Sequence, residues 1–181
     1  MTSSVSNIRN ITMIGLMAAL ITICSWISIP ITVPFTMQTF AIFFAISLLG
    51  GKGGFLSVLV WLLLGAVGLP VFSGFTGGIG KFANVTGGYL VGFLLSALLV
   101  WGITHFLGTK SPILVISMIL GLISCYALGT LWFYLLAIHN GNATSIFAIL
   151  ASCVFPFILP DIIKITLAIT IAKNMKRYIS L

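Results

Sequence analysis

The stretch ILVISMILGLISCYALGTLWFYLLAI, residues 113–138, contains no charged side chain and is longer than the roughly 20 apolar residues that a helix needs to cross a bilayer. The rest of the chain is similar, because charged residues make up only 5% of its 181 residues, against about 25% in an ordinary soluble domain. The apolar runs are continuous and do not alternate with polar residues, which favours helices over the strands of a membrane β-barrel. We therefore expect an all-α integral membrane protein.

Prolines and glycines divide the chain into six expected transmembrane helices, with approximate bounds 11–29, 36–49, 55–68, 86–107, 113–138 and 160–178. The last helix is predicted to begin at Pro160, because proline is tolerated in the first turn of a helix and is costly further in. Residues 144–159 then form a short helix or cap; the alternative is one long kinked helix from Thr144. No linker or internal repeat is visible, so residues 1–181 are predicted to form a single six-helix membrane domain.

The basic residues predict an orientation. Six helices place both termini on one side of the membrane, and that side carries Arg9, Lys52, Lys110, Lys173, Lys176 and Arg177, whereas the opposite side carries only Lys81. Because loop cations accumulate on the cytoplasmic side, both termini are predicted to be cytoplasmic. The irregular loops at residues 30–34, 73–84 and from 139 onward then face outward, where we expect a ligand pocket. The same placement argues against nucleic acid as the partner of these cations.

Asp161 is the only acidic residue of the chain, and Lys164 follows it by three positions. This spacing puts both side chains on one helix face, and ionisable residues inside membrane segments usually face a cavity or a partner. One interpretation is an ion pair that only neutralises itself. The other, which we favour, is a polar pair for ligand recognition, with a carboxylate to accept hydrogen bonds and an ammonium to donate them.

Four further polar residues are candidates for the same pocket: Gln38, Asn84, Thr86 and Tyr89. For Gln38 and Asn84 the competing interpretation is a helix cap or a turn, and for Tyr89 it is an anchor at the membrane interface.

Several function classes are disfavoured by what the sequence lacks. Residues 50–54, GGKGG, do not match the phosphate-binding pattern GxxxxGK[ST], and one carboxylate cannot provide both a Mg²⁺ site and a catalytic base. The cysteines and histidines lack metal-ligand spacing. We expect no catalytic residues, no metal and no cofactor.

Four segments together resemble the BioY family, the biotin-binding S component of energy-coupling-factor (ECF) transporters. They are residues 34–38 (PFTMQ), 64–72 (LGAVGLPVF), 86–93 (TGGYLVGF) and 157–164 (FILPDIIK). They stand in the family's order and extend over most of the chain. The sequence departs from the family at residues 84–85, where Asn-Val replaces the common Gly-Pro.

The resemblance implies an ECF S-component-like fold and a high-affinity biotin site. In that site, Asp161 and Lys164 are expected to meet polar groups of biotin, although which residue meets which end is not fixed. Phe72, Phe75 and Tyr89 are candidate walls. The carboxylate of the ligand needs a cation or N–H donors, and the candidates to bind it are Lys81, Asn84 and the backbone amides of Gly87 and Gly88. The alternatives are an S component for another vitamin, or a proton-coupled carrier that uses Asp161.

The resemblance also implies partners, namely a transmembrane coupling subunit and two cytoplasmic ATPases that would hydrolyse ATP, and a location in the bacterial cytoplasmic membrane. Gly15 and Ala19 form a small-xxx-small pair that allows another helix to approach closely. The family uses an Ala-x-x-x-Ala at this place against the coupling subunit. Packing within the bundle remains the alternative for this pair.

Overall fold

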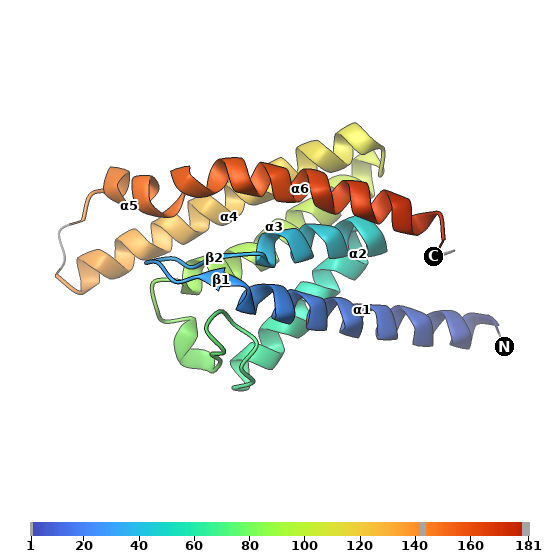
Figure 1. Cartoon of the computed structure of the whole chain (residues 1–181), viewed down its shortest axis with the longest axis horizontal. Coiled ribbons are helices and arrows are strands. Elements are labelled where there is room, and N and C mark those ends of the chain that lie inside the picture. The colour runs from blue at the N-terminus through green and yellow to red at the C-terminus, as the bar shows by residue number, and fades with distance from the viewer. Residues whose placement is uncertain (1, 142–143, 179–181) are drawn as a thin grey trace.

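The computed structural model describes residues 2–141 and 144–178. It is built from helices, with one two-stranded hairpin and one 3-10 turn among the described residues (Figure 1). The elements are α1 (Thr2–Trp26), β1 (Ser28–Ile29), β2 (Phe35–Thr36), α2 (Gln38–Ala66), η1 (Ile79–Lys81), α3 (Gly87–Leu107), α4 (Ser111–His139), α5 (Ile146–Cys153) and α6 (Phe155–Lys176).

Five of the described helices are long and apolar enough to cross a membrane: α1 from Asn7, α2, α3, α4 and α6. The two expected spans 36–49 and 55–68 both fall in α2. Gly50 interrupts this helix with a φ of 79° and a ψ of 172°, a backbone conformation that is open almost only to glycine. Figure 1 shows the chain changing direction within α2, so that α2 consists of two limbs. The second limb begins directly after Gly50, and residues 51–54 are helical.

Two expected boundaries were wrong. Residues 27–29 do not continue α1, because Ser28 and Ile29 pair with Thr36 and Phe35 in the antiparallel β1–β2 hairpin. The prolines at 30 and 34 fall between these strands. The last helix begins at Phe155 and not at Pro160, so that Pro160 lies inside α6. Pro160 removes one backbone hydrogen bond close to the helix start, and the continuing helix tolerates this loss. α5 is a separate short helix, as expected, but only Val154 separates it from α6.

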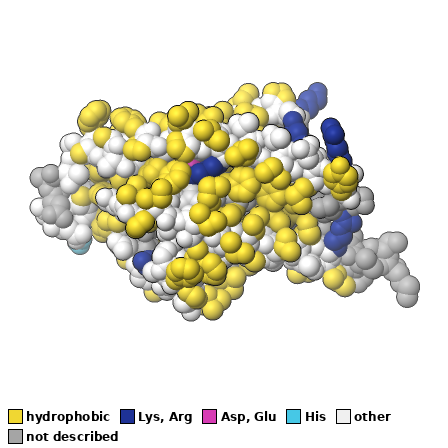
Figure 2. Space-filling model, viewed as in Figure 1, with side chains coloured by type: hydrophobic (Ala, Val, Ile, Leu, Met, Phe, Trp, Pro, Cys, Tyr) yellow, Lys and Arg dark blue, Asp and Glu magenta, His cyan; other side chains and the backbone are white. Residues whose placement is uncertain are grey.

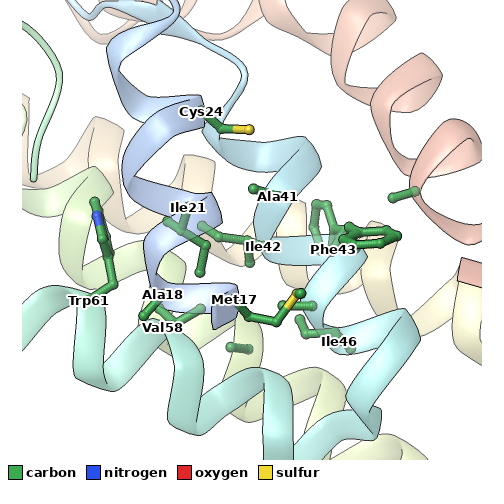
Figure 3. Close-up of a cluster of buried hydrophobic side chains, with 14 of the residues drawn as sticks. Met17, Ala18, Ile21, Cys24, Ala41, Ile42, Phe43, Ile46, Val58 and Trp61 are labelled. Carbon is green, nitrogen blue, oxygen red and sulfur yellow. The ribbon is translucent and has the colours of Figure 1, made fainter. Parts of the chain in front are cut away.

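The main core forms where α1 meets both limbs of α2 (Figure 3). In that view, the face of α1 that carries Met17, Ala18 and Ile21 lies against both limbs. The first limb contributes Ile42 and Ile46, and the second limb contributes Val58 and Trp61. The two limbs approach closely near the break, since a Cβ at Gly54 would collide with the backbone of Ile46. α2 also packs against α3 and α6, and α3 packs along α4. Much of the outer surface is apolar (Figure 2), as expected for a chain that faces lipid.

The ends of the bundle differ. The start of α1 and the end of α6 lie at one end, together with the connection from α3 to α4 (Figure 1), and Lys and Arg side chains gather at that end (Figure 2). The β1–β2 hairpin, the loop from α2 to α3, the end of α4 and the start of α5 lie toward the other end (Figure 1). The loops that we expected to build a binding site are therefore together.

Candidate functional site

A cavity of about 270 Å³ lies among the β1–β2 hairpin, the loop between α2 and α3, and helices α2 to α6. Its volume is close to the lower limit of the roughly 300–1,000 Å³ found for small-molecule pockets. Eight of the residues predicted from sequence line it: Gln38, Phe72, Lys81, Asn84, Thr86, Tyr89, Asp161 and Lys164. The fold thus brings into one cavity polar residues from segments far apart in the chain.

Asp161 and Lys164 form an ion pair at the wall of this cavity. Lys164 Nζ lies 2.8 Å from Asp161 Oδ1, and each residue is only 4% exposed. Nζ also donates to the carbonyl oxygen of Thr36, at 2.7 Å, and sits 4.0 Å from the centroid of the Phe35 ring, a distance typical of a cation–π contact. The pair therefore joins α6 to strand β2.

Tyr126 completes the surroundings of the carboxylate. Its hydroxyl, on α4, donates to Asp161 Oδ2 at 2.5 Å. Sequence reasoning missed Tyr126, because it lies inside a continuous apolar run and nothing local links it to Asp161. It also missed the roles of the Thr36 carbonyl and the Phe35 ring, which depend on the hairpin. The one available signal was that Tyr126 stands in the middle of its run, away from the interfaces where tyrosines usually collect.

Gln38 and Tyr89 present polar atoms without hydrogen-bond partners among the described residues. Gln38 Nε2 and Tyr89 Oη are both buried, and both residues line the cavity. Buried polar atoms normally have a partner, so Gln38 Nε2 marks a place where a polar group of a ligand can bind, whereas the Tyr89 hydroxyl lies near Thr130, which does not line the cavity. Gln38 is the first residue of α2, whose N-cap is Met37, and its side-chain oxygen accepts a hydrogen bond from the Thr36 hydroxyl at 3.5 Å. Gly129 makes room for Tyr89, since a Cβ there would collide with the tyrosine ring.

The remaining polar residues of the cavity come from the loop before α3. Asn84 uses its side-chain oxygen to accept a hydrogen bond from the amide of Val85, at 2.8 Å, while its carbonyl oxygen accepts one from Trp132 Nε1, at 2.9 Å. A turn role for Asn84 is therefore present, beside its place in the cavity wall. Thr86 precedes α3 and makes no capping bond. Lys81 ends η1 and is partly buried.

Phe72 is held in place by a loop that is tied to the core. Its ring packs edge-on against Trp61 and covers Gly65, where a Cβ would collide with it. The neighbouring carbonyl of Val71 accepts hydrogen bonds from Ser25 Oγ, at 2.6 Å, and from Trp61 Nε1, at 3.1 Å. These bonds fix the loop to α1 and α2.

Three predicted residues do not line the cavity: Phe75, Gly87 and Gly88. The Phe75 ring is 65% exposed and stacks on Trp26, with ring centroids 4.8 Å apart, so its place differs from that of the expected wall. The amide of Gly87 already donates to the carbonyl of Asn84. A Cβ at Gly88 would collide with Trp132, which makes the packing of α3 on α4 the reason for glycine here.

Two cysteines also line the cavity, Cys125 on α4 and Cys153 on α5. The third, Cys24, belongs to the main core. Burial raises the pKa of the Cys153 thiol, which favours the neutral form. Within the described residues, no three His, Cys, Asp or Glu side chains lie close enough together to bind a metal ion.

The fold and the cavity define a multi-pass membrane protein whose helical bundle contains a cavity of small-molecule size, lined by apolar and polar side chains. The chain belongs to the BioY family, whose model matches residues 1–181.

Relatives extend over nearly the whole chain. The biotin transporter BioY of Thermotoga maritima is 39% identical over 172 residues, which cover 93% of this chain and 96% of that protein. The probable biotin transporter BioY of Pyrococcus horikoshii is 34% identical over 169 residues, with 93% and 96% covered. Among solved structures, the crystal structure of the S component for biotin from an ECF-type ABC transporter matches with a TM-score of 0.82 and 28% identity, covering 95% of this chain and 93% of that one.

Proposed function

We propose that this protein is the biotin-binding S component of an ECF-type importer, with the ligand bound in the cavity around Asp161 and Lys164. Family membership and the relatives named as biotin transporters support this function, as does the likeness to a biotin S component. The structural observation that carries it is a buried carboxylate–ammonium pair that lines a cavity together with the unpartnered amide nitrogen of Gln38.

The donors and acceptors of the cavity suit a cyclic urea. A carboxylate has about four lone-pair positions, and Lys164 and Tyr126 use two of them on Asp161. The carboxylate can therefore accept one N–H group from the ureido ring of biotin without losing its protein partners. Gln38 Nε2 is a donor available for the ureido carbonyl.

The rest of the cavity suits the rest of the ligand. Phe72 and Tyr89 offer aromatic walls to the thioether ring and the valeryl chain. Lys81 is the only cation besides Lys164 among the lining residues, so it is the candidate for the ligand carboxylate. Phe75, Gly87 and Gly88 have no direct role in this arrangement.

The two limbs of α2 count as separate crossings in this proposal, which gives six transmembrane helices with both termini in the cytoplasm of a bacterium. The gathering of cations at the end with both termini supports this orientation (Figure 2). The cavity then opens toward the outside, and the protein resides in the cytoplasmic membrane.

Transport requires partners, which we propose are a transmembrane coupling subunit and two cytoplasmic ATPases. Gly15 and Ala19 are both exposed on the outer face of α1, and nothing in the described bundle lies within 4 Å of a Cβ built at Gly15. This placement favours docking of another helix over packing within the bundle.

Titration of biotin into the detergent-purified protein, followed by calorimetry, tests the proposed ligand. We expect one-to-one binding of biotin and no heat from thiamine or riboflavin. Absence of biotin binding by a protein of full helical content would refute the proposal, and preferential binding of another vitamin would keep the S-component class while changing its ligand.

A further inference from the structure

A second hollow lies at the opposite end of the bundle from the ligand cavity. It is a groove of about 730 Å³ between the early turns of α1 and the break in α2. Its polar rim contains Arg9 and Lys52 together with the amide side chains of Asn7 and Asn10. Its floor is aliphatic and includes Ile14, Leu48 and Leu56. The groove shares no lining residue with the ligand cavity.

Lys52, at the rim of the groove, has no acidic side chain of the protein to pair with. Asp161 is the only acidic residue in the sequence, and it is bound to Lys164 inside the bundle. Lys52 is exposed and lies two residues after Gly50, whose unusual backbone sets the direction of the second limb of α2. A counter-charge for Lys52 from an acidic side chain must therefore come from another molecule.

We propose that this groove is a binding site for an anionic phospholipid. The phosphate lies at the rim beside Lys52, Arg9 and the asparagine amides, and an acyl chain lies along the aliphatic floor. The arrangement of a cationic, amide-bearing rim above an apolar floor matches the two-part chemistry of a lipid and does not match a small soluble anion. The site is at the end where Lys and Arg gather (Figure 2), which is the level at which lipid headgroups meet such residues.

The proposal does not depend on the identity of the transported ligand. Its test compares lipids that share the same acyl chains and differ in charge. The purified protein is delipidated and mixed with phosphatidylglycerol or phosphatidylcholine, and bound lipid is counted by native mass spectrometry. We expect phosphatidylglycerol to be retained roughly tenfold more than phosphatidylcholine.

Two matched variants locate the site. Lys52→Gln removes the cation at the rim, and Lys110→Gln removes a cation at the same end that does not line the groove. We expect Lys52→Gln to reduce phosphatidylglycerol retention to the level of phosphatidylcholine, and Lys110→Gln to leave it unchanged. Circular dichroism and the midpoint of thermal unfolding in detergent show that each variant is folded.

Four results would overturn the proposal. Equal retention of the two lipids, or equal loss in both variants, would show that the charge acts diffusely and that no site exists. Displacement of the lipid by millimolar inorganic phosphate would assign the rim to a soluble anion. A Lys52→Gln protein that retains the lipid but no longer associates with a coupling subunit would assign the groove to a protein partner.

Discussion

The hydroxyl of Tyr126 on α4 donates a hydrogen bond of 2.5 Å to the Asp161 carboxylate on α6. Lys164 binds the other carboxylate oxygen, so the carboxylate is held from two sides. Asp161 also lines the cavity, so the lone pairs that these two partners leave are available to a ligand. Tyr126 thus acts on a ligand through Asp161, and its contribution can be separated from that of the ion pair.

Tyr126→Phe removes this hydrogen bond and leaves the ring in place. A buried acceptor that loses its donor costs about 1–3 kcal/mol, and we expect biotin to bind roughly tenfold more weakly in calorimetric titration because the carboxylate is less well oriented. Tyr134→Phe is the matched control, since Tyr134 is on the same helix and does not line the cavity. Equal biotin affinity of Tyr126→Phe and Tyr134→Phe would show that the Tyr126 hydroxyl does not contribute to ligand binding.

The Asp161–Lys164 ion pair should contribute to the stability of the fold as well as to ligand binding. Lys164→Met leaves the Asp161 charge buried without its cation, and removing one partner of a buried pair typically costs about 3–5 kcal/mol. We expect a clear fall in the midpoint of thermal unfolding in detergent, and partial recovery in the double variant Asp161→Asn with Lys164→Met, which has neither charge. If Lys164→Met were as stable as the parent, the Asp161 charge would have to be solvated by water.

Cys153 offers a probe of cavity occupancy. In a variant with Cys24→Ala and Cys125→Ala, maleimide labelling of Cys153 should be slowed by biotin, because the ligand covers this wall. Burial raises the pKa of the Cys153 thiol above its ordinary value of 9.0, so less reactive thiolate is present at neutral pH. The labelling rate should therefore still be rising with pH above 9.0.

The control is a variant that keeps only Cys24, whose thiol lies in the main core and not at the cavity. Biotin should leave its labelling rate unchanged. If biotin slowed the labelling of both thiols equally, the protection would reflect general stabilisation of the fold. That result would contradict the placement of the ligand beside Cys153.

The exposed position of Gly15 on α1 leads to a prediction about association with the coupling subunit. Gly15→Leu places a large side chain where another helix would approach closely, and we expect co-purification with the coupling subunit to be lost while biotin titration is unchanged. Leu16→Trp is the control, because Leu16 is 55% exposed and points to a different side of the helix. Normal co-purification of Gly15→Leu would place the docking surface elsewhere.

The sequence predicted α3 and α4 closely, because each is one continuous apolar run that ends at glycine, proline or lysine. It also identified Asp161 and Lys164, because two ionisable residues inside a membrane run are rare enough to stand out. It predicted neither the β1–β2 hairpin nor the continuation of α6 through Pro160. The hairpin depends on a tertiary contact, because the Thr36 carbonyl oxygen accepts a hydrogen bond from Lys164 of α6. Pro160 lies close to the start of α6, where a missing backbone hydrogen bond costs less.

The parts of the site that the sequence did not predict are those that combine distant segments. Tyr126 precedes Asp161 by 35 residues, and a tyrosine in an apolar run is indistinguishable from a packing residue until the partner helix is known. Phe75 was predicted to form a wall of the pocket and does not line the cavity. It lies in the loop expected to form the pocket, but its backbone has a φ of 56°, and its ring stacks on Trp26 outside the cavity lining.

Binding of biotin at the Asp161–Lys164 pair is tested by the biotin affinity of the parent and of Asp161→Asn, measured side by side. The asparagine keeps the size of the side chain but replaces one acceptor oxygen with a donor that opposes an N–H group of the ligand. We predict one-to-one binding by the parent and at least a hundredfold weaker binding by the folded variant. Equal affinity in the two proteins would contradict the account.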